Sequence, residues 1–136
     1  MKQKDFNDLR LLIVDDQPEM RALIKNMLME SGITQLFEAA DGKEAMNFMD
    51  NALDFIDIVI CDWNMPRLTG VEILRQLRSF NPEMPFLMVT GRSDIASVAE
   101  AKSSGVSAYI RKPFSPAQLE AKLRIIKFRM DEKLIA

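Results

Sequence analysis

Carboxylates follow two short apolar runs of this 136-residue chain. Asp15 and Asp16 come directly after the run Leu11–Val14, and Asp62 comes directly after the segment Ile56–Cys61, which is apolar except for Asp57. Three carboxylates that meet at one place repel each other unless they are protonated or share a cation. Mg²⁺ relieves such repulsion, because it binds carboxylate oxygens and keeps further positions for water and phosphate oxygens. These three residues are therefore candidate ligands of a magnesium ion.

Polar side chains of other types follow the same pattern farther along the chain. Asn64 lies two residues after Asp62, and Thr90 and Lys112 each follow a later apolar run. A lysine ammonium is a point positive charge and a threonine hydroxyl donates a hydrogen bond, so the set suits a phosphoryl group. Each residue alone has an ordinary explanation as a cap, a turn or a surface lysine. Their shared position at the ends of successive runs favours a functional site, with one carboxylate as the nucleophile.

Five apolar segments of strand length alternate with segments of helical periodicity. The predicted strands are residues 11–14, 36–39, 56–61, 85–89 and 107–111. Capping boxes at Thr69–Glu72 and Ser115–Gln118 predict two helix starts, and a helix is predicted over 93–104. This alternation predicts an α/β fold with a parallel sheet covered on both faces. Ligands bind outside the carboxyl ends of such strands, which is where the polar residues above are expected.

Composition excludes several classes of protein. Lys and Arg number 18 and Asp and Glu number 20, and the net charge of -2 argues against a nucleic-acid binder. No histidine is present, which excludes a catalytic triad, a histidine-ligated metal and an internal phosphohistidine. The single Cys61 excludes an internal disulfide and a cysteine zinc cluster. No apolar run has the length of a membrane span, and residues 1–10 lack a signal-peptide core, so we expect a cytoplasmic protein without membrane insertion.

The motifs at the strand ends resemble the receiver domain of two-component response regulators, most of all the single-domain chemotaxis regulators. The resemblance is carried by Asp15-Asp16, Cys61–Pro66, Gly70, Thr90-Gly91 and Lys112–Phe114. It covers about residues 9–130 and implies that residues 1–136 form a single receiver domain. It also implies a three-layer, flavodoxin-like (βα)5 fold whose five-stranded parallel sheet has the order 2-1-3-4-5. The order comes from the resemblance and not from the hydrophobic pattern.

The resemblance implies a role for each matching acidic position. Asp62 is the phospho-acceptor. Asp16 and Asp62 bind Mg²⁺ through their side chains, and Asn64 binds it through its backbone carbonyl. Asp15 holds the ion through water.

The resemblance also implies a switch. Lys112 contacts the phosphoryl oxygens, and its peptide bond to Pro113 is expected to be cis. Thr90 and Tyr109 match the switch pair of the family, in which the threonine moves toward the phosphoryl group and the aromatic ring turns inward. The phosphoryl donor is a phosphohistidine on a separate sensor histidine kinase. The output is binding to a protein target such as a flagellar motor switch protein.

Two positions depart from the chemotaxis regulators. Arg92 stands where these regulators have a shorter acidic residue, and a guanidinium there can pair with the phosphoryl group or shield it from water. The hypothesis is slow self-dephosphorylation. Gln17 stands where an aromatic residue is common, so it is a second candidate for modulating the site and its partners.

Three alternatives compete with this signalling interpretation. The chain can be a receiver domain cut from a larger regulator. It can also be an Asp-dependent phosphohydrolase, although such enzymes need a cap insertion and a second acid two residues after the nucleophile, where this chain has Asn64. A flavin-binding module needs a Ser/Thr/Gly-rich loop after the first strand, whereas Asp15–Pro18 would repel phosphate.

Overall fold

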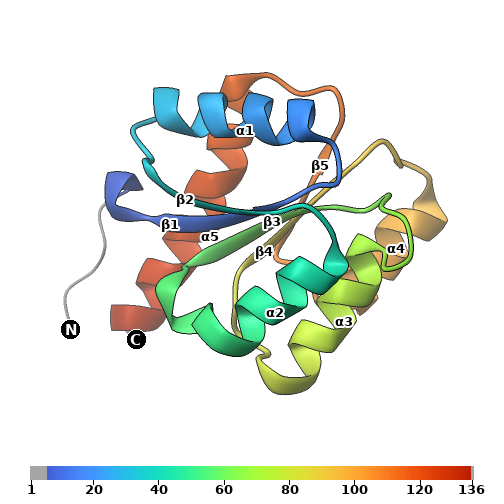
Figure 1. Cartoon of the computed structure of the whole chain (residues 1–136). Coiled ribbons are helices and arrows are strands. Elements are labelled where there is room, and N and C mark those ends of the chain that lie inside the picture. The colour runs from blue at the N-terminus through green and yellow to red at the C-terminus, as the bar shows by residue number, and fades with distance from the viewer. Residues whose placement is uncertain (1–5, 136) are drawn as a thin grey trace.

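Five parallel strands form the centre of the structure, a computed structural model that describes residues 6–135 (Figure 1). The strands are β1 (Arg10–Val14), β2 (Gln35–Ala39), β3 (Ile58–Asp62), β4 (Phe86–Thr90) and β5 (Ala108–Arg111). The helices are α1 (Pro18–Glu30), α2 (Gly42–Ala52), α3 (Gly70–Phe80), α4 (Ile95–Ser103) and α5 (Pro116–Ile135), with short 3-10 helices η1 (Phe6–Asp8) and η2 (Leu53–Phe55). The described residues do not include residues 1–5 and 136. Both ends of the predicted domain 1–136, and part of the segment 1–10 that was expected to lack a signal peptide, therefore lie outside them.

The strand order is β2-β1-β3-β4-β5, which confirms the flavodoxin-like arrangement. Helices α1 and α5 cover one face of the sheet, and α2, α3 and α4 cover the other (Figure 1). Successive residues of a strand point to opposite faces. In β1, Leu12 packs under α2–α4 while Leu11 and Ile13 pack under α1 and α5. Because both faces are covered, the central strands are continuously apolar, as the sequence pattern predicted.

Local hydrogen bonds fix where the helices begin. The Thr69 side chain and the Glu72 carboxylate form the predicted capping box at the start of α3. Ser115 and Gln118 exchange the equivalent bonds at the start of α5, at 2.8 and 3.1 Å. Helix α4 begins at Ile95 and not at 93, because the Asp94 side chain accepts the Ser97 backbone N–H and acts as the N-cap.

The third strand also begins later than predicted. The apolar run starts at residue 56, but β3 starts at Ile58 and extends to Asp62, because η2 turns the chain just before it. Asp57 then binds the start of β1: it accepts bonds from the Arg10 backbone N–H at 2.8 Å and from the Arg10 guanidinium at 3.2 and 3.3 Å. This ion pair closes the amino end of the sheet between β1 and β3.

Two more arginines hold the amino end of the sheet. The Arg78 guanidinium donates to the carbonyl groups of Gly105 and Asn81, at 2.9 and 3.1 Å. Arg129 of α5 donates to the carbonyl of Ser107 at 2.8 Å.

Among the described residues, no helix is both long and apolar enough to cross a membrane.

Candidate functional site

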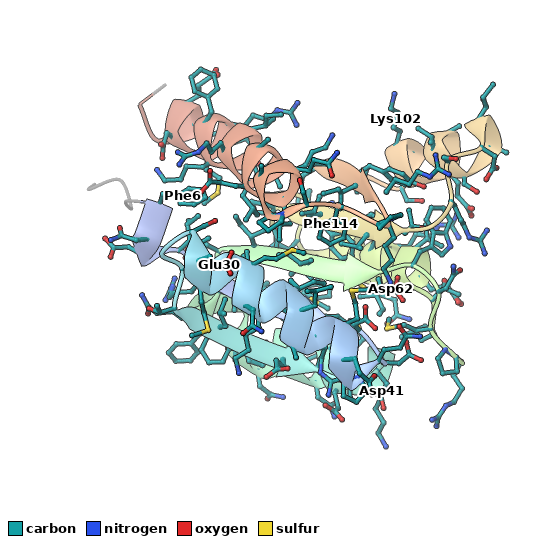
Figure 2. All side chains as sticks on the ribbon, turned by 90° about the horizontal axis from the view of Figure 1, so that it is seen from above. Phe6, Glu30, Asp41, Asp62, Lys102 and Phe114 are labelled. Carbon is teal, nitrogen blue, oxygen red and sulfur yellow. The ribbon has the colours of Figure 1, made fainter. Side chains whose placement is uncertain are left out.

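Three carboxylates gather at the carboxyl end of the sheet. Asp15 and Asp16 follow β1, and Asp62 is the last residue of β3, at the tip of the strand arrow in Figure 2. One carboxylate oxygen from each residue lies within 4.8 Å of the other two. Asp15 is fully buried and Asp62 is 5% exposed, so neither charge is well solvated. The neighbouring strands β1 and β3 thus bring together carboxylates that are 46 to 47 positions apart in the chain (62 minus 16, 62 minus 15).

One ammonium group faces this cluster. The Lys112 Nζ atom lies 3.0 Å from Asp62 Oδ1 and 3.7 Å from Asp15 Oδ2. Lys112 follows β5, and its peptide bond to Pro113 is cis, as the resemblance implied. Among residues 6–135, Lys112 is thus the one cation in contact with this cluster of three carboxylates, and the cluster is left with an excess of negative charge.

Burial raises the pKa of both buried carboxyl groups above the usual aspartate value. For Asp62, the hydrogen bond from Lys112 opposes this rise in pKa. For Asp15, the backbone N–H of Gln17 opposes it most, donating to Oδ1 at 2.9 Å. The other oxygen of Asp15, Oδ2, is buried without a hydrogen-bond partner among the described residues. An unsatisfied oxygen and excess negative charge, in a set of oxygen donors, fit a hard divalent cation.

Thr90 and Tyr109 lie beside the cluster and are joined through the backbone of residue 92. The Arg92 N–H donates to the Thr90 hydroxyl at 2.9 Å, and the Tyr109 hydroxyl donates to the Arg92 carbonyl. Thr90 is fully buried and Tyr109 is half-buried, packed against the core under α2–α4. Burial raises the pKa of Tyr109, and a contact with Thr90 opposes that rise.

The Arg92 side chain contacts the loop that follows the candidate phospho-acceptor. Its Nε and Nη2 atoms donate to Asn64 Oδ1 at 3.3 and 3.1 Å. Its guanidinium carbon lies 5.0 Å from the centre of the Trp63 ring, and Trp63 is 2% exposed. Sequence reasoning predicted a cation near Asp62 but missed both of these contacts. The signal in the sequence was an arginine after β4 and a tryptophan after the neighbouring β3.

Gln17 reaches the site through its backbone only. Its N–H contacts Asp15, while its side chain is exposed. Pro113 is exposed and follows Lys112 in the β5–α5 loop. The candidate residues of the sequence analysis therefore lie at one end of the sheet, on the loops and strand ends of β1, β3, β4 and β5, except Tyr109, which lies within β5 opposite Met88.

Cys61 lies behind the site, fully buried in the core. Its thiol contacts the Asp62 carbonyl at 3.3 Å. Burial raises the pKa of this thiol well above its usual value, and the nearby Asp62 and Asp15 charges add to the rise. Since the thiolate is the reactive form, Cys61 is not a nucleophile of this site.

Comparison with known proteins places this geometry in a family. Residues 11–124 match the response regulator receiver domain family. The chemotaxis protein CheY1 of Helicobacter pylori is 38% identical over 120 residues, which are 87% of this chain and 96% of the relative. The chemotaxis protein CheY of Pseudomonas aeruginosa is 37% identical over 125 residues, 90% of this chain and 99% of the relative.

A solved structure agrees with the sequence relatives. The response regulator receiver domain protein from Clostridium thermocellum has a TM-score of 0.84 and 28% identity, over 94% of this chain and 99% of that one. The family match, the strand order and the carboxylate cluster at the ends of β1 and β3 lead to the same conclusion. This chain belongs to the response regulator receiver domains, and it is of the CheY type.

Proposed function

We propose that the chain is a phosphorylation switch of a two-component system and that Asp62 is its phospho-acceptor. One observation carries the proposal. Asp62 is a buried carboxylate 3.0 Å from the Lys112 ammonium, within a cluster whose negative charge exceeds its positive charge. Such a carboxylate can act as the nucleophile in phosphoryl transfer. The lysine is positioned to neutralise the charge of the incoming phosphoryl oxygens.

The phosphoryl donor is a phosphohistidine on a sensor histidine kinase. An oxygen of Asp62 attacks phosphorus, the new O–P bond forms as the N–P bond breaks, and the imidazole nitrogen keeps the bonding electron pair. Asp16 and Asp62 would hold Mg²⁺ through their side chains, Asn64 through its backbone carbonyl and Asp15 through water. The ion supplies positive charge that reduces repulsion between the carboxylates and the phosphoryl oxygens.

The switch acts through Thr90 and Tyr109. A phosphoryl group adds about -1.5 to -2 charge and strong acceptor oxygens at Asp62. To donate to it, the Thr90 hydroxyl must rotate while it accepts the Arg92 N–H, and Tyr109 is bound to the carbonyl of that same residue. Phosphorylation therefore favours one arrangement of β4, β5 and their flanking helices over another, through contacts that differ between the two states.

The output is a change of affinity for a protein target at the surface formed by α4, β5 and α5. The curated relatives are named as chemotaxis proteins, which supports a chemotaxis partner such as a flagellar motor switch protein.

We infer a cytoplasmic receiver domain over residues 1–136 with no nucleic-acid partner and no membrane insertion. Its only enzymatic activity is slow self-dephosphorylation. A phosphohydrolase is not proposed, because Asn64 stands where the second acid of those enzymes is needed.

Arg92 and Gln17 tune the lifetime and the partners of the phosphorylated state. The Arg92 guanidinium lies against Trp63 and Asn64, the two residues after Asp62. From that position it can pair with the phosphoryl group and restrict the approach of water. Gln17 is exposed next to the acidic pair, where it can contact a partner.

The test follows the fluorescence of Trp63, the one tryptophan of the chain. Addition of Mg²⁺ should change the emission, and acetyl phosphate or beryllofluoride should then change it further. Asp62→Asn should abolish the second response. Asp57→Asn, at the opposite end of the sheet, is the matched control and should keep both responses. Equal responses of wild type and Asp62→Asn to the phosphoryl donor would show that Asp62 is not the acceptor.

A further inference from the structure

The first residue of α3 lies against the backbone of the phospho-acceptor. A Cβ atom added to Gly70 would lie 2.3 Å from the Asp62 carbonyl oxygen and 2.9 Å from the Trp63 Cα. Both distances are far below van der Waals contact. The Gly70 N–H also donates to the Trp63 carbonyl at 2.9 Å. Since the crowded atoms are backbone atoms, no side-chain rotation can make room for a larger residue.

Helix α3 is not free to retreat from this contact. Its first turn is held by the capping box of Thr69 and Glu72. Just beyond, Ile73 and Leu74 are fully buried in the core under α2–α4. Packed cores resist displacement, so a side chain at position 70 would push mainly on the backbone between Asp62 and Asn64.

A second glycine restrains the same loop from the side of α2. A Cβ atom at Gly42 would lie 2.6 Å from the Cβ and Cδ2 atoms of Leu68. Here the crowded atoms belong to a side chain, which can yield in part. Gly91, at the end of the neighbouring strand β4, has nothing within 4 Å of an added Cβ and is exposed. The two close contacts are therefore specific to the loop after Asp62.

We propose that Gly70 is a positioning residue for the phosphorylation site. By lacking a side chain, it lets α3 rest on the Asp62 and Trp63 backbone and so sets the direction of the Asp62 carboxylate and the Asn64 carbonyl toward Asp15 and Asp16. This inference rests on the function proposed above for those residues.

The test compares Gly70→Ala with Gly91→Ala in Mg²⁺ titrations of the whole chain without any phosphoryl donor. Trp63 fluorescence and calorimetry report the dissociation constant, and urea unfolding reports stability. Gly70→Ala should weaken Mg²⁺ binding by the folded protein by about tenfold or more, which is the size of effect that substitutions around metal ligands have. Gly91→Ala should change it by less than about twofold. A folded Gly70→Ala protein that binds Mg²⁺ as wild type does would overturn the proposal.

If Gly70→Ala does not fold, Gly42→Ala decides, because its crowded atoms belong to the Leu68 side chain and not to the backbone of Asp62 and Trp63. Gly42→Ala should weaken Mg²⁺ binding by a few-fold, since positioning effects at metal sites are of that order or larger. Adding Leu68→Gly removes all three crowded side-chain atoms, Cβ included, and should restore binding to the level of Leu68→Gly alone. A loss of stability in Gly42→Ala with unchanged Mg²⁺ binding would show that the loop contacts are merely structural. If wild type itself binds no Mg²⁺, the proposed function fails and not this inference alone.

Discussion

The two ends of the sheet differ in the balance between positive and negative side chains. At the amino end, Arg10 and Asp57 form a one-to-one pair with bonds of 2.8 to 3.3 Å. At the carboxyl end, Lys112 alone faces three carboxylates, and Asp15 keeps a buried oxygen without a hydrogen bond among the described residues. Both ends sit on the same strands, β1 and β3, so secondary structure does not explain the contrast.

The contrast distinguishes a matched ion pair from the unmatched cluster that forms the proposed phosphorylation site. The attraction within a matched pair offsets the cost of desolvating its charges, whereas an unmatched buried cluster leaves part of that cost uncompensated. The raised pKa of Asp15 and of Asp62 has the same origin, because burial penalises their charged forms. The carboxyl end of the sheet therefore carries the uncompensated charge on which the proposed Mg²⁺ and phosphoryl binding rests, whereas the charges of Arg10 and Asp57 compensate each other at the amino end.

We expect the largest difference between the two ends of the sheet when one cation is removed from each. Lys112→Ala should slow phosphorylation by acetyl phosphate by about 100-fold or more, because it removes the group aimed at the phosphoryl oxygens. Arg10→Ala should leave that rate unchanged and lower the free energy of unfolding by about 1 kcal/mol or more, because it breaks a half-buried pair. Phosphorylation rates and urea unfolding of both variants provide the check. A wild-type rate in Lys112→Ala would remove the distinction between the ends.

Neutralising one acid at each end should change stability in opposite directions. Without Mg²⁺, Asp15→Asn should raise the free energy of unfolding by roughly 1 kcal/mol, because it removes a buried charge that repels Asp16 and Asp62. Asp57→Asn should lower it by a similar amount, because it weakens the bonds to Arg10. Urea unfolding in EDTA measures both. Changes of the same sign would mean that the cluster is as well compensated as the pair.

The pH dependence of Mg²⁺ binding sharpens the comparison further. The pKa of the Asp15 and Asp62 carboxyl groups is higher in the folded chain than in the unfolded chain. Without metal, their contribution to stability is therefore fully present below the unfolded pKa and is lost as pH rises through the folded pKa. Mg²⁺ needs the carboxylate form, so its affinity should fall as pH decreases through that same raised pKa.

Titrations of Trp63 fluorescence with Mg²⁺, from about pH 7 down to about pH 4, measure this dependence. The pH-dependent loss should be smaller in Asp15→Asn, which has one titrating carboxyl group fewer. An affinity that does not change over this range would contradict the raised pKa of the cluster.

The smallest expected effect concerns the cation at the rim of the site. Arg92→Glu should shorten the half-life of phosphorylated Asp62, because it removes an exposed partner of the phosphoryl group and adds a like charge. An exposed ion pair contributes up to about 1 kcal/mol, so the change should be up to about fivefold. Lys102→Glu, an exposed charge reversal on α4, is the control and should leave the half-life unchanged. Equal half-lives of wild type and Arg92→Glu would refute the shielding hypothesis.

The sequence predicted which polar side chains meet at the sheet edge better than it predicted some element boundaries. Each buried strand is a continuous apolar run, so the polar residue that ends it marks the sheet edge, as Asp15 and Asp62 do. The two capping boxes were predictable because their hydrogen bonds join residues three apart. The strand order came from the resemblance, since hydrophobic patterns carry no information on which strands are neighbours.

Contacts between distant residues account for what sequence reasoning missed. The pairing of Asp57 with Arg10 joins residues 47 positions apart, and nothing in the sequence around either residue indicated it. The contact of Arg92 with Asn64 spans 28 positions and two loops. Gly70 was part of the recognised motif, but its close approach to Asp62 depends on how α3 packs on the sheet.

The fully buried thiol behind the acceptor gives the molecule an internal reporter of unfolding. Cys61 belongs to a central strand, so alkylating reagents reach its sulfur only when β3 separates from its neighbours. The rate of its modification therefore counts opening events at the core of the sheet. Because that sulfur does not react while the protein is folded, a second cysteine introduced on the surface can be labelled with a dye without labelling Cys61.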